Sequence, residues 1–133
     1  MLLALIATHA VLGALTPLLV RRLAARAFFV LALGPIAGAA WLTSLGPTVV
    51  SGGAYLESYR WIPMLSVDLS LRIGLLQWVL AMIVTWIGAL VLLYSRWYFD
   101  GSTSPRSASV LTLFAGTMLG LVTADNLVVL YIF

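Results

Sequence analysis

The chain has 133 residues, of which 63% are hydrophobic and 8% are charged. A soluble domain carries about 25% charged residues, so this composition excludes a water-soluble globular protein and indicates a polytopic membrane protein. The absence of cysteine excludes disulfides and thiolate metal sites, and one histidine and four acidic residues leave little material for catalysis. We therefore expect a membrane protein that is not an enzyme and has no metal site, no cofactor and no nucleic-acid partner.

Four apolar runs are long enough to cross a membrane, and a fifth begins close to the last residue. The first run is followed, not preceded, by arginines, which favours a retained helix over a signal peptide. We expect an all-α polytopic fold, with residues 1–133 forming a single membrane domain. Its predicted helices cover about residues 2–20, 27–45, 74–94, 108–123 and 127–133, the last of them cut short.

The seven arginines predict the orientation of these helices. The segment after the first run holds Arg21, Arg22 and Arg26 with no acidic residue, and the segment after the third holds Arg96 and Arg106. The long loop 46–73 balances two arginines against two acidic residues. Because basic residues are enriched in cytoplasmic loops, we expect both arginine-rich segments inside the cell. The N-terminus and loop 46–73 then lie outside the cell membrane.

The outer loop has the pattern of a β-hairpin. In "SVDLSLRI", residues 66–73, polar and apolar side chains alternate, which is typical of a half-buried strand, and "YLESYRWI" before it is rich in β-forming residues. We expect an extracytoplasmic hairpin between the second and third helices. Its polar face is predicted to carry Glu57, Arg60, Asp68 and Arg72, paired across the strands, facing water or another protein chain.

His9 lies deep within the first predicted span, away from the other titratable side chains. An ionisable residue inside a membrane is a candidate for proton transfer, so His9 is a candidate ion-pathway residue. The alternative is a neutral imidazole that is hydrogen-bonded to a neighbouring helix or to Thr8 or Thr16.

Asp125 and Asn126 precede the last apolar run. Both residue types accept hydrogen bonds from free N–H groups in the first turn of a helix, so we expect them to cap it. A carboxylate at the outer surface also attracts cations, which makes Asp125 a second candidate for the ion pathway. The run from Leu127 to Phe133 rises only about 10 Å, a third of the ~30 Å hydrocarbon core, so we expect the chain to be a fragment.

Several stretches together resemble a known family. They are "RWIPMLSVDLSLRIGLLQWVLAMIVTWIGALVLLYSRWYFDG", "FAGTMLGLVTADNLVVLYIF" and the opening "LLALIATHAVLGALTPLLVRRLAARAFFVLAL". They are similar to the N-terminal part of the large antiporter-like protein, the A component, of Mrp-type multisubunit Na⁺/H⁺ antiporters. That superfamily is shared with the antiporter-like large membrane subunit of respiratory complex I.

The resemblance implies a protein that exchanges Na⁺ for H⁺ using the proton motive force, within a hetero-oligomeric complex in the lipid bilayer. In the family, the segment after Ala-Asp-Asn continues into a Trp-Glu pair whose Glu handles protons, and channel lysines lie further on. This chain has no lysine, so we expect it to lack the ion-translocating residues. A fragment of a complex I or membrane hydrogenase protein, and a non-transporting membrane scaffold, remain as alternatives.

One position departs from the family pattern. Relatives usually have Asp-Gly-Leu-Ser where the third span begins, and this chain has Gly74, Leu75, Leu76 and Gln77 there. The expected aspartate is missing. The connection between the hairpin and the third helix is therefore expected to differ from that of relatives.

Overall fold

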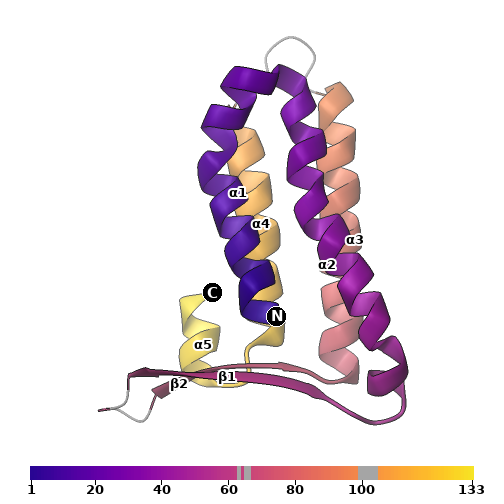
Figure 1. Cartoon of the computed structure of the whole chain (residues 1–133), viewed down its shortest axis with the longest axis vertical. Helices are drawn as coiled ribbons and strands as arrows, with labels where there is room; N and C mark the ends of the chain where they lie inside the picture. The colour runs from indigo at the N-terminus through magenta and orange to yellow at the C-terminus, as the bar shows by residue number, and fades with distance from the viewer. Residues whose placement is uncertain (63, 65–66, 99–104) are drawn as a thin grey trace.

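The computed structural model describes residues 1–62, 64, 67–98 and 105–133. In Figure 1 the helices stand side by side and the hairpin lies across one end of them. The described elements are, in chain order, α1 (Leu2–Leu23), a 3-10 turn (Ala24–Arg26), α2 (Ala27–Val50), β1 (Tyr55–Ile62), β2 (Val67–Ile73), α3 (Leu75–Tyr98), α4 (Pro105–Thr123) and α5 (Leu127–Ile132).

Four of the described helices are long and apolar enough to cross a membrane: α1, α2, α3 and most of α4. The 24 residues of α3, for example, rise about 36 Å, which exceeds the ~30 Å hydrocarbon core. The expected fold class is confirmed, with four candidate spans and a hairpin between the second and third. The chain is a multi-pass membrane protein.

The long helices extend beyond the apolar runs that predicted them. α1 ends at Leu23 instead of residue 20, α3 at Tyr98 instead of 94, and α4 begins at Pro105 instead of 108. α2 continues through Pro47 to Val50 instead of ending at 45, so the predicted loop 46–73 is shorter than expected. Backbone groups in lipid have no water to bond, so a helix keeps its own hydrogen bonds until the chain reaches the polar boundary.

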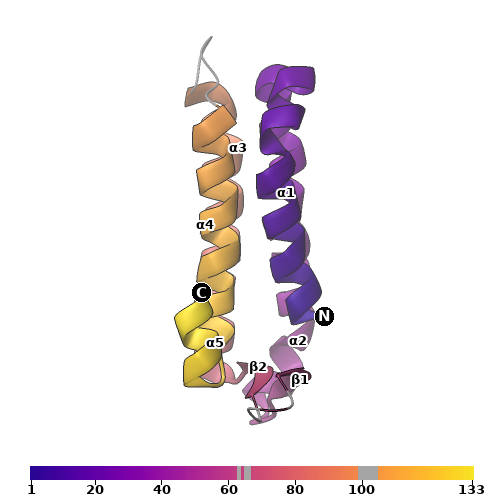
Figure 2. The same cartoon turned by 90° about the vertical axis from the view of Figure 1, so that its left-hand side faces the viewer.

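The four spans form a bundle in which α1 packs mainly on α4 and α2 on α3 (Figures 1 and 2). Glycines allow the helices to approach closely. A Cβ atom at Gly13 would lie 2.6 Å from the side chain of Leu113, and one at Gly38 would lie 3.1 Å from Leu5. The Ser109 hydroxyl of α4 also donates to the Gly13 carbonyl of α1 at 2.7 Å. Small residues and interhelical hydrogen bonds hold the helices together where hydrophobicity supplies no drive.

The hairpin is antiparallel, and one of its faces covers the end of the bundle. Glu57 lies opposite Leu71, and Arg60 lies opposite Asp68. Leu71 and Ile73 are fully buried against the helices, as the period-two pattern predicts. Pro63, which the sequence places near the turn, lies outside the described residues.

The connection between α4 and α5 is joined to the hairpin. Ala124 forms a β-bridge with Leu71, and the Asp125 N–H donates to the Ser70 carbonyl at 3.0 Å. α5 then turns back beside α4 (Figure 1), and the ring of Phe133 occupies the space that a Cβ at Gly120 would need. The hairpin therefore connects to the segment that joins the last two helices.

Candidate functional site

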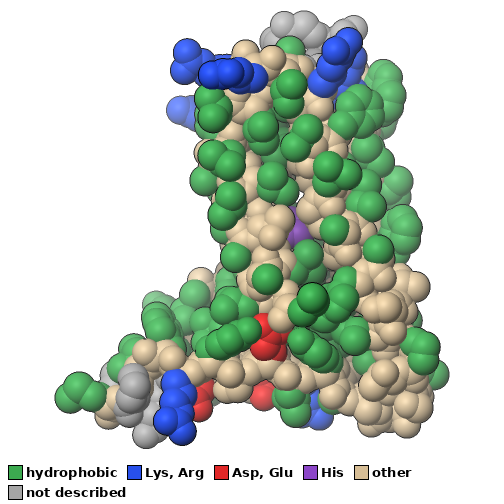
Figure 3. Space-filling view, in the orientation of Figure 1, with side chains coloured by type: hydrophobic (Ala, Val, Ile, Leu, Met, Phe, Trp, Pro, Cys, Tyr) green, Lys and Arg blue, Asp and Glu red, His purple; other side chains and the backbone are tan. Residues whose placement is uncertain are grey.

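His9 is buried at the meeting point of three helices. Its side chain is 1% exposed, and a small edge of it is visible between its neighbours in Figure 3. Gly116 of α4 lies against the His9 Cβ, where an added Cβ would come within 2.6 Å. Gly34 of α2 faces the ring, and a Cβ there would lie 3.5 Å from Nε2. Two glycines from different helices thus provide the space for one imidazole.

The hydrogen bonding of His9 differs from both partners that the sequence suggested. Its Nδ1 lies 2.8 Å from the Leu5 carbonyl oxygen of the same helix. Thr8 and Thr16 instead donate to the carbonyls of Ala4 and Leu12, respectively. Because a carbonyl only accepts, Nδ1 carries the proton in this arrangement and Nε2 of the neutral ring is an acceptor. The helix's own backbone was available four residues away, so no partner from another helix was needed.

In the part of the chain that the structure describes, His9 has no charged side chain beside it in the bundle interior. Among the described residues of α1, α2, α3 and α4, the arginines lie at the helix ends, and the middle turns carry no Asp, Glu, Lys or Arg. No group of three His, Cys, Asp or Glu suited to a metal ion occurs among the described residues. Among the middle turns of the described helices, His9 is therefore the one His, Asp, Glu, Lys or Arg side chain.

Glu57 makes several strong hydrogen bonds at the hairpin end. Its Oε2 accepts from the Met1 ammonium at 2.6 Å and from the Leu2 N–H at 2.7 Å. Its Oε1 accepts from the Tyr59 hydroxyl at 2.6 Å, and the side chain is only 9% exposed. The carboxylate therefore ties the hairpin to the first turn of α1, where the helix dipole also favours negative charge.

This environment changes the acidity of the residues around Glu57. Burial raises the pKa of Glu57, but the hydrogen bonds from Met1, Tyr59 and Leu2 outweigh burial, so the pKa lies below its ordinary value. The hydrogen bond to Glu57 raises the pKa of Tyr59. Burial, followed by the charge of Glu57, raises the pKa of Tyr55. The cluster is therefore a carboxylate surrounded by neutral and positive donors.

The prediction of one polar face on the hairpin was wrong for Glu57. Strand neighbours an odd number of residues apart point to opposite faces, so Glu57 lies on the helix side and Arg60 on the outer side. Asp68 and Arg72 share the outer side with Arg60. Among the described residues, the one ion pair joins Met1 to Glu57, so the cross-strand neighbours Arg60 and Asp68 form no ion pair.

Asn126, and not Asp125, occupies the cap position of α5. The Asn126 Oδ1 accepts from the Val129 N–H at 2.8 Å, while its Nδ2 donates to the Asp68 carbonyl at 2.8 Å. One side chain thus caps a helix and binds the hairpin. The Asp125 side chain is exposed, and its backbone N–H supplies the bond to Ser70. The structure brings Asp125 and Asn126 onto the hairpin and leaves His9 in the bundle interior.

Gln77 forms a hydrogen bond with Gly74 at the start of α3. The Gln77 Oε1 accepts from the Gly74 N–H at 3.2 Å, and the Gly74 carbonyl accepts from the Trp78 N–H at 2.8 Å. This is the reciprocal half of a capping box, in which a Gln at the third helical position reaches back to the cap residue. The three-residue spacing from Gly74 to Gln77 was a readable signal that sequence reasoning missed.

Comparisons with known proteins agree with the resemblance. Residues 61–106 match the family model described as NADH-Ubiquinone oxidoreductase (complex I), chain 5 N-terminus. The chain is 36% identical over 103 residues to the A/B component of a probable K(+)/H(+) antiporter of Rhizobium meliloti, covering 75% of this chain and 10% of the relative. It is 35% identical over 107 residues to the A1 component of a Na(+)/H(+) antiporter of Staphylococcus haemolyticus. This match covers 80% of this chain and 13% of the relative.

A solved structure also shares the fold. The chain matches a chain of the Mrp complex from a Dietzia species with a TM-score of 0.76 and 36% identity, over 98% of this chain and 14% of that one. The chain thus spans only about a tenth to a seventh of these relatives. The resemblance read from the residues is confirmed: the chain is similar to the A component of multisubunit cation/proton antiporters, and part of it matches a family model named after chain 5 of complex I.

Proposed function

We propose that the chain is part of a protein that exchanges a monovalent cation for protons across the cell membrane. The observation that carries this proposal is its 35–36% identity to antiporter proteins from two organisms over most of its length. Their names specify K⁺/H⁺ and Na⁺/H⁺ exchange, so the shared chemistry is a monovalent cation against H⁺. Na⁺ is the cation that we propose here.

Within that protein, we propose that this segment supports the ion path and does not form it. The middle turns of its described spans hold one titratable side chain, His9, whose Nδ1 is bonded to its own helix. A proton path needs successive ionisable groups or waters, and His9 has no such neighbour among the described residues. His9 therefore serves helix packing, and the exposed Asp125 attracts cations to the outer surface without binding them tightly.

The charge distribution supports an orientation with the N-terminus outside. The arginines Arg21, Arg22, Arg26, Arg96 and Arg106 gather at the end of the bundle opposite the hairpin, where Figure 3 shows the basic side chains. The positive-inside rule assigns this end to the cytoplasm. The hairpin, with its outward Arg60, Asp68 and Arg72, then faces the exterior and is open to contact with other subunits of a hetero-oligomeric antiporter.

The second candidate is a component of a complex I-type quinone reductase or a membrane hydrogenase. The matching family model, which is named after complex I, favours it. The two candidates differ in what drives ion movement, because an antiporter uses an existing gradient and a quinone reductase uses NADH.

The decisive experiment expresses the complete gene that encodes this chain, with its neighbouring genes, in bacteria that lack their own antiporters. Everted membrane vesicles are energised until they are acidic inside, and then receive NaCl, KCl or choline chloride. Antiport predicts a rise of internal pH with Na⁺ or K⁺ and none with choline. A rise with neither cation, together with NADH-quinone reductase activity that purifies with the chain, would replace the antiporter proposal with the second candidate.

A further inference from the structure

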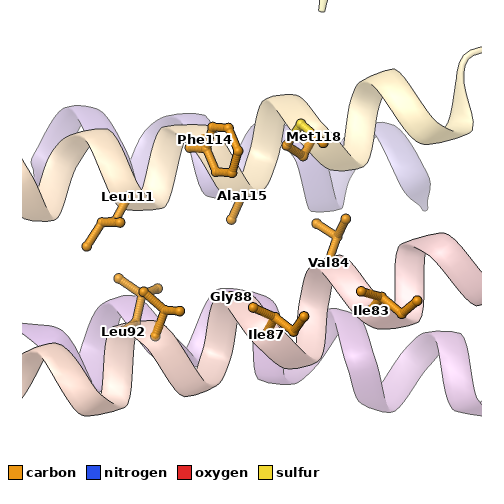
Figure 4. A pocket seen from close by; sticks show the side chains of 10 residues that line it. Ile83, Val84, Ile87, Gly88, Leu92, Leu111, Phe114, Ala115 and Met118 are labelled. Atoms are coloured by element: carbon orange, nitrogen blue, oxygen red, sulfur yellow. The ribbon is translucent and has the colours of Figure 1, made fainter.

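An apolar groove runs along the bundle between α3 and α4. Its volume is about 270 Å³, and its walls are formed by large side chains of both helices that face one another across it (Figure 4). Ile83 and Ile87 of α3 and Leu111, Phe114 and Met118 of α4 are among them. Ile87 and Phe114 are 55% and 61% exposed, so the groove opens to the outside of the bundle.

The groove lies at the depth of the lipid tails. Its lining on α3 runs from Ile83 to Leu92, whereas α3 itself spans Leu75–Tyr98. At about 1.5 Å per residue, the groove thus begins about 12 Å from one end of the span and stops about 9 Å from the other. Hydrocarbon fills this central region of a bilayer, so a lipid tail suits both the depth and the apolar lining of the groove.

The shape of the groove fits a flexible chain better than another helix. Inside this protein, helices meet through glycines: a Cβ at Gly34 or Gly38 would lie 3.1 Å from a leucine of α1. The groove has small residues, Gly88 and Ala115, only at its floor, and its rim is formed by branched, aromatic and thioether side chains. Such a rim holds a second helix backbone at a distance, whereas a lipid tail can enter between the side chains.

One end of the groove is strongly basic. Arg96 follows Leu92 by four residues on α3, and Arg106 precedes Leu111 by five on α4, which places both arginines about 6 to 8 Å further along the helices. Arg21, Arg22 and Arg26 lie at the same end of the bundle, and the described residues there include no Asp or Glu. With the orientation proposed above, on which this step rests, arginines at this depth match the phosphate of an anionic lipid in the cytoplasmic leaflet.

We propose that this groove binds one acyl chain of an anionic phospholipid, whose phosphate lies beside Arg96. The lipid covers the apolar surface between α3 and α4 and joins the two helices on the side away from α1 and α2. This site is independent of which cation the complete protein transports.

These 133 residues contain no cysteine, so a single cysteine introduced here labels one chosen position of the complete protein once any cysteines elsewhere in it are replaced. Ile87→Cys places a fluorescent label in the groove. Val11→Cys is the matched control on α1, because Val11 is 56% exposed and lies at a similar distance from the basic end of its helix. The labelled proteins are reconstituted in phosphatidylcholine vesicles that contain equal small fractions of brominated phosphatidylglycerol or brominated phosphatidylcholine.

We expect brominated phosphatidylglycerol to quench the label at residue 87 about fivefold more effectively than brominated phosphatidylcholine does. This is the ratio expected when one arginine attracts an anionic lipid. At residue 11 the two lipids should quench alike. Equal quenching by both lipids at residue 87 overturns the anionic site. Quenching by neither lipid there shows that protein covers the groove, and it overturns the proposal as well.

A second pair of variants tests the phosphate end. Arg96→Gln in the Ile87→Cys protein is expected to reduce the preference for phosphatidylglycerol to near one. Arg22→Gln, which removes an arginine from α1 at the same end of the bundle, should leave the preference unchanged. If both variants retain the full preference, or both lose it, Arg96 does not bind the phosphate and that part of the proposal is wrong.

Discussion

The middle of the bundle and its hairpin end are stabilised by different interactions. In the middle, Gly116 and Gly34 make room for His9, and the fit depends on shape. At the hairpin end, Glu57 and Asn126 each bond to a segment more than 50 residues away in the chain. Lipid offers no hydrophobic drive between helices, so close packing dominates there, whereas side-chain hydrogen bonds, those of Glu57 charged and those of Asn126 neutral, form at the boundary with water.

The largest effect is expected from filling the space beside His9. Gly116→Ala places a Cβ 2.6 Å from the His9 Cβ, close to two helix backbones that cannot move freely. We expect a loss of about 2 to 3 kcal/mol in the free energy of unfolding, the upper part of the range for overpacked cores. Unfolding in mixed detergent and SDS micelles measures it.

Gly88→Ala is the control for this prediction. Its Cβ would lie 3.5 Å from the Ala115 Cβ, which is an ordinary contact. The higher helix propensity of alanine should then leave stability unchanged or slightly increased. Equal losses in both variants would show that glycine matters for helix flexibility and not for the fit around His9.

A somewhat smaller effect is expected at the hairpin end. Glu57→Gln removes the charge that Met1, Leu2 and Tyr59 bind, with an expected loss of about 2 kcal/mol at neutral pH. Asp68→Asn, on the exposed outer face, should change stability by less than about 0.5 kcal/mol. The same micelle unfolding compares the two. A loss in Asp68→Asn as large as that in Glu57→Gln would contradict the special role of Glu57.

The contribution of Glu57 should also depend on pH. Because its pKa in the folded protein lies below the ordinary value of 4.5, the stabilisation is complete above that value and is lost as pH falls through the lowered value. The wild-type protein should therefore lose more stability than Glu57→Gln between neutral and acidic pH. Parallel pH profiles for the two proteins would rule out this linkage.

Two substitutions of Asn126 separate its helix cap on α5 from its hydrogen bond to the hairpin. Asn126→Ala loses both the cap on Val129 and the bond to the Asp68 carbonyl, and should cost about 1 to 2 kcal/mol. Asn126→Asp keeps the capping oxygen and loses only the donor, so its loss should be about half as large. The free energies of unfolding of the two variants distinguish these contributions. Equal losses in Asn126→Ala and Asn126→Asp would mean that the cap contributes little.

The smallest effect concerns transport. If His9 serves packing, His9→Gln in the complete antiporter should keep exchange within about twofold and leave its pH profile unshifted. Removing an obligatory proton-transfer group lowers rates by about a hundredfold or more. Cation-dependent proton release from energised vesicles measures the difference, and a loss of that size would make His9 part of the ion path.

Much of the fold was readable from local pattern. The apolar runs predicted four spans, the alternation in residues 66–73 predicted β2, and the Asp-Asn pair predicted a helix start near residue 127. The helix ends were misplaced by several residues, because hydropathy falls at the headgroups while the helix hydrogen bonds continue. The second helix was expected to end at residue 45, but α2 continues through Pro47 to Val50.

The sequence by itself determined which segments lie in the membrane, because burial in lipid depends on the composition and period of each segment alone. It also identified the family, through residues close together in the chain. Only the tertiary structure decided the partners of His9 and Glu57. Gly116 lies 107 positions from His9, and Leu2 lies 55 positions from Glu57. Such pairs depend on how whole helices pack, and no local pattern encodes that packing.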